Sequence, residues 1–213
     1  MVEVLEGVRT VDLSGADGLD LEAYLLDCGG EVVLVDTGMV PRDVERIGAE
    51  LREMGKGWRD IGLTLLTHKH GDHTNNLGRI KELTGAEVMA GEGDAADIEV
   101  ATGVSVDRGL RHGDRLDLCG GIEAIHVPGH SAGNLSFYLP RQRVIIAGDT
   151  IFGDEDGNIR PPPEKYCLDA GMAEREIRRL LSYDFDSLLL SHGKNLLMGA
   201  KSRVRKLCEE ASP

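Results

Sequence analysis

Residues 66–75 read LTHKHGDHTN and place three histidines and an aspartate within six positions, at the spacing His-x-His-x-Asp-His. They lie at the end of an apolar run over residues 62–68 that has the length of a buried strand. In an extended segment His68 and His70 point the same way and can reach one metal ion, while Asp72 and His73 come one turn later and can address a second. Imidazole and carboxylate ligands without a thiolate suit Zn²⁺, and also Fe or Mn. The segment therefore predicts a metal site.

Three further positions repeat this pattern of a polar side chain at the end of an apolar run. His130 follows a strand-like run in VPGHSAGN, Asp149 does so in IIAGDT, and His192 does so in LLLSHG. At such positions a ligand needs no place in the core, and the sheet beneath holds it rigidly. Together with residues 68–73, they account for five of the seven histidines of the chain. We therefore expect these residues to form one metal-binding constellation.

The order of apolar patterns predicts an α/β protein. Strands are expected over residues 8–13, 21–28, 31–38, 62–68, 86–90, 121–129, 134–139, 143–152 and 187–193. Four helices are indicated by apolar residues near a 3.6-residue period: Val44, Ile47, Leu51 and Met54 after Pro41; Leu77, Ile80 and Leu83 before Gly85; Met172, Ile177, Leu180 and Leu181; and Val204, Leu207 and Cys208. No linker-like segment separates the halves, so we expect a single domain over residues 1–213, with two packed sheets covered by helices.

The formal net charge of −13 argues against nucleic acid or an anionic membrane as a partner. No run approaches the roughly 20 apolar residues of a membrane helix, and the first ten residues lack the features of a signal peptide. The four cysteines form no C-x-x-C pair, which disfavours a thiolate zinc site. These observations predict a cytoplasmic protein acting on a small molecule, and they leave its oligomeric state open.

The ordered motifs H-x-H-x-D-H, His130, Asp149 and His192 resemble those of the metallo-β-lactamase superfamily over nearly the whole chain. The resemblance implies a four-layer αβ/βα sandwich and two divalent metal ions. It also implies that His68, His70 and His130 bind the first ion, that Asp72, His73 and His192 bind the second, and that Asp149 bridges them. Asp36 in VLVDTG matches a further family position, where its carboxylate would orient a ligand histidine through a ring N–H.

Two such ions would lower the pKa of a shared water, and the resulting hydroxide would attack an electrophilic carbon or phosphorus. Asp72 or Asp149 could then relay a proton to the leaving group. The chain resembles glyoxalase II in the segment Asp149-Thr150-Ile151-Phe152, and lactonases in DTGM at residues 36–39, although many lactonases have Tyr where this chain has Phe152. We therefore expect a hydrolase of a small ester, thioester or lactone.

Two other activities stay open as alternatives. One is a mononuclear iron enzyme similar to the persulfide dioxygenases, and the other is a promiscuous phosphodiesterase or weak β-lactamase. Met39, Phe152, Arg160 and Tyr166 are candidates for the substrate pocket, the last two in a proline-rich loop after Asp149. His112 and His126 are not expected to bind metal. Many relatives also have two glycines after the last His of the motif, where this chain has Thr74, Asn75 and Asn76.

Overall fold

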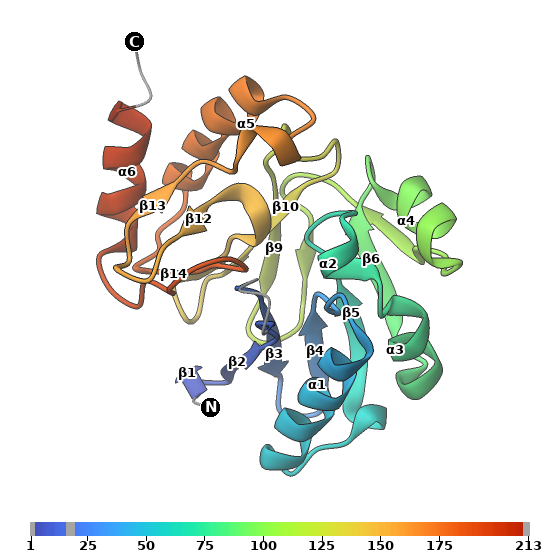
Figure 1. Ribbon diagram of the computed structural model, residues 1–213. Coiled ribbons are helices and arrows are strands. Elements are labelled where there is room, and N and C mark those ends of the chain that lie inside the picture. Colours follow the sequence, from blue (N-terminus) through green and yellow to red (C-terminus); the bar gives the residue numbers. More distant parts are fainter. Residues whose placement is uncertain (1–2, 16–19, 211–213) are drawn as a thin grey trace. The chain divides into compact units, whose positions relative to one another are not determined.

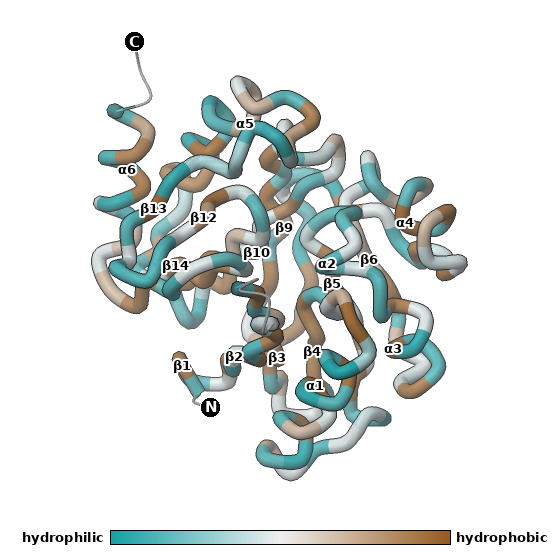
Figure 2. Tube along the Cα trace, viewed as in Figure 1, coloured by the Kyte–Doolittle hydropathy of each residue, from teal (hydrophilic) through white to brown (hydrophobic). Residues whose placement is uncertain are grey.

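The computed structural model describes residues 3–15 and 20–210 (Figure 1). The chain folds into two compact units, Met1–Gly109 and Leu110–Pro213. Each unit has its own sheet and its own helices, and Figure 2 shows hydrophobic residues along the central strands of each. No helix within the described residues is long and apolar enough to cross a membrane.

The first unit is built on a seven-stranded sheet whose strands lie side by side in chain order. Neighbours from the first strand to the fourth are antiparallel, whereas the fourth, fifth and sixth strands run parallel. Parallel neighbours place their carboxyl ends at the same edge of the sheet, which brings the segments after residues 35 and 65 together. The strands are β1 (Glu3–Leu5), β2 (Val8–Asp12), β3 (Glu22–Asp27), β4 (Val32–Val35), β5 (Ile61–Leu65), β6 (Glu87–Gly91) and β7 (Arg108–Leu110).

Two helices of this unit form where the sequence predicts them. α1 (Pro41–Glu53) begins with Pro41 in its first turn and buries Val44, Ile47 and Leu51 against the sheet. α3 (Leu77–Thr84) ends at Gly85, which adopts the left-handed conformation typical of a helix C-terminus. The unit also contains a 3₁₀ turn, η1 (Trp58–Asp60), and two short helices, α2 (Gly71–Thr74) and α4 (Ala95–Thr102). No apolar repeat in the sequence predicts α4, because Ile98 is its one buried residue.

The second unit is built on a five-stranded sheet of order β14-β11-β10-β9-β8. β11 and β14 are parallel and the other neighbours are antiparallel. A separate two-stranded ribbon pairs β12 with β13. The strands are β8 (Arg115–Leu116), β9 (Ile122–His126), β10 (Leu135–Leu139), β11 (Val144–Ile146), β12 (Phe152–Gly153), β13 (Ile159–Arg160) and β14 (Ser187–Leu189).

Two expectations for this unit need correction. The strand predicted over residues 143–152 ends at Ile146, because Gly148 adopts a positive φ of 55° and the chain turns into the 3₁₀ segment η2 (Gly148–Thr150). The helix predicted around Ile177 is α-helical only in α5 (Ala170–Glu176) and continues as the 3₁₀ helix η4 (Ile177–Ser182). The proline-rich loop contains the short 3₁₀ turn η3 (Glu164–Tyr166). α6 (Ala200–Glu210) packs Val204, Leu207 and Cys208 into the core, as predicted.

Candidate metal-binding residues

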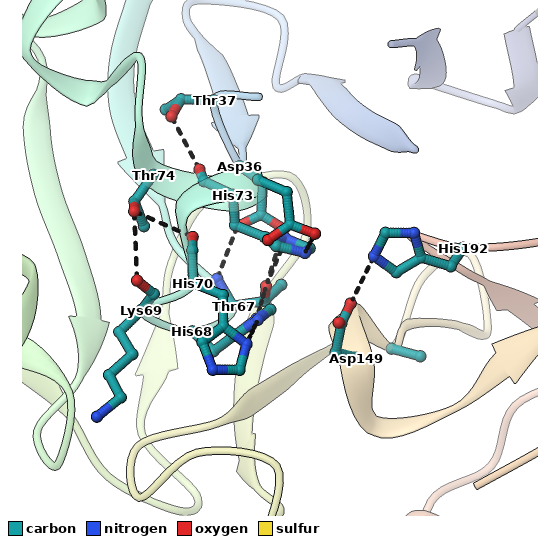
Figure 3. A network of polar contacts seen from close by, with 12 residues as sticks. Asp36, Thr37, Thr67, His68, Lys69, His70, His73, Thr74, Asp149 and His192 are labelled. Atoms are coloured by element: carbon teal, nitrogen blue, oxygen red, sulfur yellow. Dashed lines mark hydrogen bonds and ion pairs between the residues drawn. The ribbon is translucent and has the colours of Figure 1, made fainter. Parts of the chain in front are cut away.

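Side chains that could hold a metal ion occur in both units. In the first unit they follow β5 directly. His68 is fully buried, and His70 is the N-cap residue of α2, whose single turn carries Asp72 and His73. The ring nitrogens His68 Nε2 and His70 Nδ1 lie 3.0 Å apart, and His73 Nε2 lies 3.6 Å from Asp72 Oδ2. Four potential ligands are thus gathered by the end of one strand and one helical turn, and Figure 3 labels His68, His70 and His73 among them.

A buried carboxylate at the end of the neighbouring strand β4 holds the histidine rings. Asp36 accepts hydrogen bonds from the Thr67 backbone N–H (2.9 Å) and hydroxyl (2.8 Å), and its Oδ2 lies 2.8 Å from His73 Nδ1. Because an ionised carboxylate can only accept, His73 Nδ1 carries the proton. The Thr67 hydroxyl, having donated to Asp36, accepts from His68 Nδ1 at 3.1 Å. In their neutral forms both imidazoles therefore carry the lone pair on Nε2, the form that binds a metal ion.

The backbone at Asp36 is adapted to this role. Asp36 has a φ of 64° and Gly38 a φ of 80°, and a Cβ at Gly38 would lie 2.7 Å from the Asp43 Cβ. A left-handed backbone conformation costs free energy in a residue other than glycine, and it persists only where the surrounding contacts hold it. Thr37 contributes such contacts, because its N–H and its hydroxyl both donate to the His73 carbonyl at 2.8 Å. The turn after β4 is therefore fixed against the metal-binding segment by its backbone as well as by Asp36.

In the second unit three separate chain reversals supply the candidate ligands. His130 follows β9, Asp149 lies in η2 after β11, and His192 follows β14. All three are buried, with exposed fractions of 1%, 3% and 9%. The Asp149 carboxylate lies between the two rings, with Oδ2 3.3 Å from His130 Nε2 and Oδ1 3.4 Å from His192 Nε2. The second of these contacts is drawn in Figure 3.

Packing and loop contacts hold these rings in place. The Phe152 ring stacks on His192, with centroids 4.8 Å apart and an interplanar angle of 15°, and its centroid is 6.4 Å from that of His130. The N–H of Leu168 donates to the His130 carbonyl, and Cys167 Sγ lies 3.8 Å from His130 Nδ1. Burial, followed by the charge of Asp149, raises the pKa of the Cys167 thiol, so this group is neutral at pH 7. Neither Cys167 nor Thr67 was predicted as part of the site, because neither is one of the His and Asp positions of the motifs.

The remaining predicted residues lie at different depths. Met39 and Tyr166 are 45% and 52% exposed, and Arg160 is also exposed. Phe152 is only 7% exposed because its ring is packed against His192. His112 lies in an exposed turn, and His126 Nε2 is bonded to the Ala132 carbonyl.

Comparison with known proteins identifies a family. The family model described as "Metallo-beta-lactamase superfamily" matches residues 21–192. The chain is 34% identical over 98 residues to the hydroxyacylglutathione hydrolase of Rhizobium meliloti (strain 1021), which covers 46% of this chain and 36% of the relative. It is 36% identical over 127 residues to the enzyme of the same name from Methylobacterium sp. (strain 4-46), covering 57% and 47%. The matches thus span less than half of either relative.

Solved structures resemble the fold over almost the whole chain. A metallo-β-lactamase family protein from Thermus thermophilus superposes with a TM-score of 0.76 at 21% identity, covering 98% of this chain and 80% of that one. The subclass B3 metallo-β-lactamase of Bradyrhizobium japonicum gives a TM-score of 0.74 at 24% identity, covering 98% and 90%. At these identities the likeness establishes the fold, and it confirms the predicted α/β class of the metallo-β-lactamase type.

Proposed function

Because the chain belongs to the metallo-β-lactamase superfamily, whose members named above include metal-dependent hydrolases, we propose that it hydrolyses a small-molecule ester, thioester or lactone at a centre of two divalent metal ions. The proposal assigns His68, His70 and His130 to one ion and Asp72, His73 and His192 to the other, with Asp149 shared. The assignment follows the order of the family motifs, and the contacts within each unit support it.

The donor chemistry of the residues fits such ions. A tetrahedral ion with bonds of about 2.0–2.1 Å places its ligand atoms about 3.3–3.4 Å from one another. Within the second unit, the Asp149 oxygens lie 3.3 and 3.4 Å from the Nε2 atoms of His130 and His192. Imidazole nitrogens and carboxylate oxygens in this proportion favour Zn²⁺ and are compatible with Fe or Mn. This spacing is the single observation that carries the proposal.

When bound, divalent ions would supply Lewis acidity and make water acidic enough to act as a nucleophile at neutral pH. The protein residues then bind, orient and move protons. Asp36 and Thr67 hold the Nδ1 atoms of His73 and His68, which selects the neutral tautomer whose Nε2 can bind a metal ion. Asp72 is suited to relay a proton to the leaving group, because its side chain is 24% exposed and can exchange with solvent, whereas that of Asp149 is 4% exposed.

Among the possible substrates, a thioester has the strongest support. The two curated relatives described above are named hydroxyacylglutathione hydrolases, and that name denotes cleavage of a thioester. Met39, Arg160 and Tyr166 are exposed and available for contact with a substrate. Phe152 supports the ligand His192 and contributes at most an edge of its ring. We further propose that the enzyme acts in the cytoplasm, where such acyl thioesters occur.

Metal content and thioester hydrolysis, measured on the same purified protein, test the proposal. We expect about two ions per chain, activity that is lost on chelation, and restoration by Zn²⁺. His70→Ala and Asp149→Ala are each expected to lower kcat/KM by about 100-fold or more, because a ligand is removed outright. His112→Ala and His126→Ala, which change histidines elsewhere, should leave kcat/KM within about twofold.

Two results would overturn the proposal. One is full hydrolytic activity of the His70→Ala and Asp149→Ala variants on every ester, thioester and lactone tested. The other is a single bound iron together with oxygen consumption on a persulfide, which would instead establish an oxygenase.

A further inference from the structure

Asn76 begins helix α3, three residues after the candidate ligand His73, and its side chain is placed unusually for a residue at that position. An asparagine at a helix N-cap ordinarily accepts a hydrogen bond from one of the first backbone N–H groups of the helix. Asn76 makes no such bond. Its amide Nδ2 instead donates to the carbonyls of Thr37 and Val40, each at 3.0 Å. The side chain, 6% exposed, is therefore directed to the turn after β4 rather than to its own helix.

That turn is the one that holds His73. Its first residue, Asp36, binds the His73 ring, and its second, Thr37, donates twice to the His73 carbonyl. Asn76 adds hydrogen bonds in the opposite direction. It follows His73 in the chain and donates to the carbonyls of Thr37 and Val40 in the same turn. Segment 73–76 and turn 36–40 are thus joined in both directions.

Asp36 has a φ of 64°, and in a residue other than glycine this left-handed conformation persists only where surrounding contacts fix the backbone. Asp43 Oδ2 accepts from the N–H groups of Met39 and Val40, which secures the end of the turn to α1. The two bonds from Asn76 hold the carbonyls of Thr37 and Val40, and the Val40 carbonyl also accepts from the Asp43 N–H at 2.9 Å.

We propose that Asn76 is a positioning residue: by holding the carbonyls of Thr37 and Val40, it fixes the turn whose Asp36 sets the orientation and tautomer of the His73 ring. This inference rests on the proposed function only in taking His73 as a metal ligand. It assigns the segment Thr74-Asn75-Asn76 a part in the metal site. Thr74 acts on the other side of the same helical turn, where its hydroxyl contacts the carbonyls of Lys69 and His70.

The substitution Asn76→Asp tests this role with almost no change in size. A carboxylate cannot donate to two carbonyls, but it can cap α3, because aspartate is as good an N-cap as asparagine. We expect the dissociation constant for Co²⁺ or Zn²⁺ to rise about 10-fold, at the low end of the effect of losing a contact behind a ligand. The visible spectrum of the Co²⁺ protein should change, and the melting temperature should also fall, because a buried carboxylate would then face two carbonyls.

Two further variants separate positioning from stability. Asn76→Ala removes the donors without adding a cap, so it should weaken metal binding as Asn76→Asp does and also lower the melting temperature. Ile80→Val trims a fully buried side chain of the same helix, so it should lower the melting temperature and leave the metal dissociation constant unchanged.

A measurement without metal completes the test. In the metal-free protein the Nδ1–H proton of His73, bonded to Asp36, should give a downfield NMR signal that shifts or broadens in Asn76→Asp and persists in Ile80→Val. An unchanged signal and unchanged metal affinity in both Asn76 variants would overturn the inference, as would losses of affinity that merely track the melting temperature. If the unsubstituted protein bound no metal, the proposed function would fail, and the His73 signal would still decide the role of Asn76.

Discussion

The two units hold their candidate ligands by different means. In the first unit, four ligands lie within six residues, and polar contacts from Asp36, Thr37 and Thr67 hold the His73 ring and backbone. In the second unit, three ligands come from three separate chain reversals. There the His192 ring is held by an aromatic stack, and the His130 loop is held by the backbone of residues 167–169. Polar positioning depends on the protonation state and charge of a few atoms, whereas positioning by packing depends on volume and shape. Substitutions should therefore act differently in the two units.

The largest effect is expected for Asp36→Ala in the first unit. The change leaves the Thr67 N–H, the Thr67 hydroxyl and His73 Nδ1 without their shared acceptor in a buried site. We expect the metal dissociation constant to rise about 10- to 100-fold and the free energy of unfolding to fall by about 2–4 kcal/mol. Calorimetric titration with Zn²⁺ and urea denaturation measure the two quantities.

Asp36→Asn is the matched control. Asparagine tolerates the left-handed backbone at this position and can still accept from the Thr67 N–H, but it lacks the charge that fixes the His73 tautomer. Its effect should lie between those of the original protein and Asp36→Ala. Metal binding by Asp36→Ala that equals the original would contradict polar positioning in this unit.

A smaller effect is expected for Phe152→Leu in the second unit. Leucine keeps the site apolar but removes the stacked ring behind His192, a contact worth about 0.5–1.5 kcal/mol beyond the buried area. The metal dissociation constant should rise by less than about 10-fold, since about 1.4 kcal/mol corresponds to one factor of ten.

The same substitution at Phe137, a fully buried residue of β10, supplies the control for Phe152→Leu. Phe137→Leu should lower the free energy of unfolding without changing metal affinity. If both phenylalanine variants altered metal affinity equally, the stack on His192 would have no specific role.

The difference between ligands that are close in sequence and contacts that depend on the fold explains what the sequence could predict. The motif over residues 68–73 is local, so its clustering could be predicted without knowing the fold. The contact between Asp36 and His73 depends on β4 and β5 being parallel neighbours, and only the family resemblance indicated that Asp36 orients a ligand histidine. The strands β2 to β6, β9 to β11 and β14 follow from apolar runs, although several end earlier than predicted, and the short strands β1 and β13 were not predicted. The helices α1 and α3 follow from periodicity and from the signals at Pro41 and Gly85.

The misses concern features that depend on tertiary contacts. Phe152 stays a predicted pocket residue, and nothing in the sequence indicates that its ring also stacks flat on His192. α4 has one buried residue and hence no periodic signal, and the early end of β11 depends on the positive φ of Gly148. Such details arise from packing, which single-sequence patterns do not encode.

The smallest expected effect concerns the scaffold of the second unit rather than a ligand. Burial and the hydrogen bond to Glu123 raise the pKa of Tyr183 from 10.0 to about 12. The unfolded chain therefore loses this phenol proton near pH 10, while the folded protein retains it up to about pH 12. The contribution of the Tyr183 phenol to the free energy of unfolding is complete below about pH 10 and is lost as the pH rises toward about 12. The loss amounts to about 1–2 kcal/mol after allowance for partial exposure.

Denaturant unfolding between about pH 8 and 11.5 measures this loss, which should be smaller in Tyr183→Phe than in the original protein. Tyr138→Phe is the neighbouring control: its ring lies 5.1 Å from that of Tyr183, and burial also raises its pKa. Metal affinity at about pH 8 should be the same in both variants, because neither tyrosine contacts a ligand ring in the described contacts of this unit. A change in metal affinity with Tyr183→Phe would mean that residues beyond the Phe152 stack on His192 also affect the ligands of the second unit. The effect of packing on metal binding there could then not be assigned to single residues.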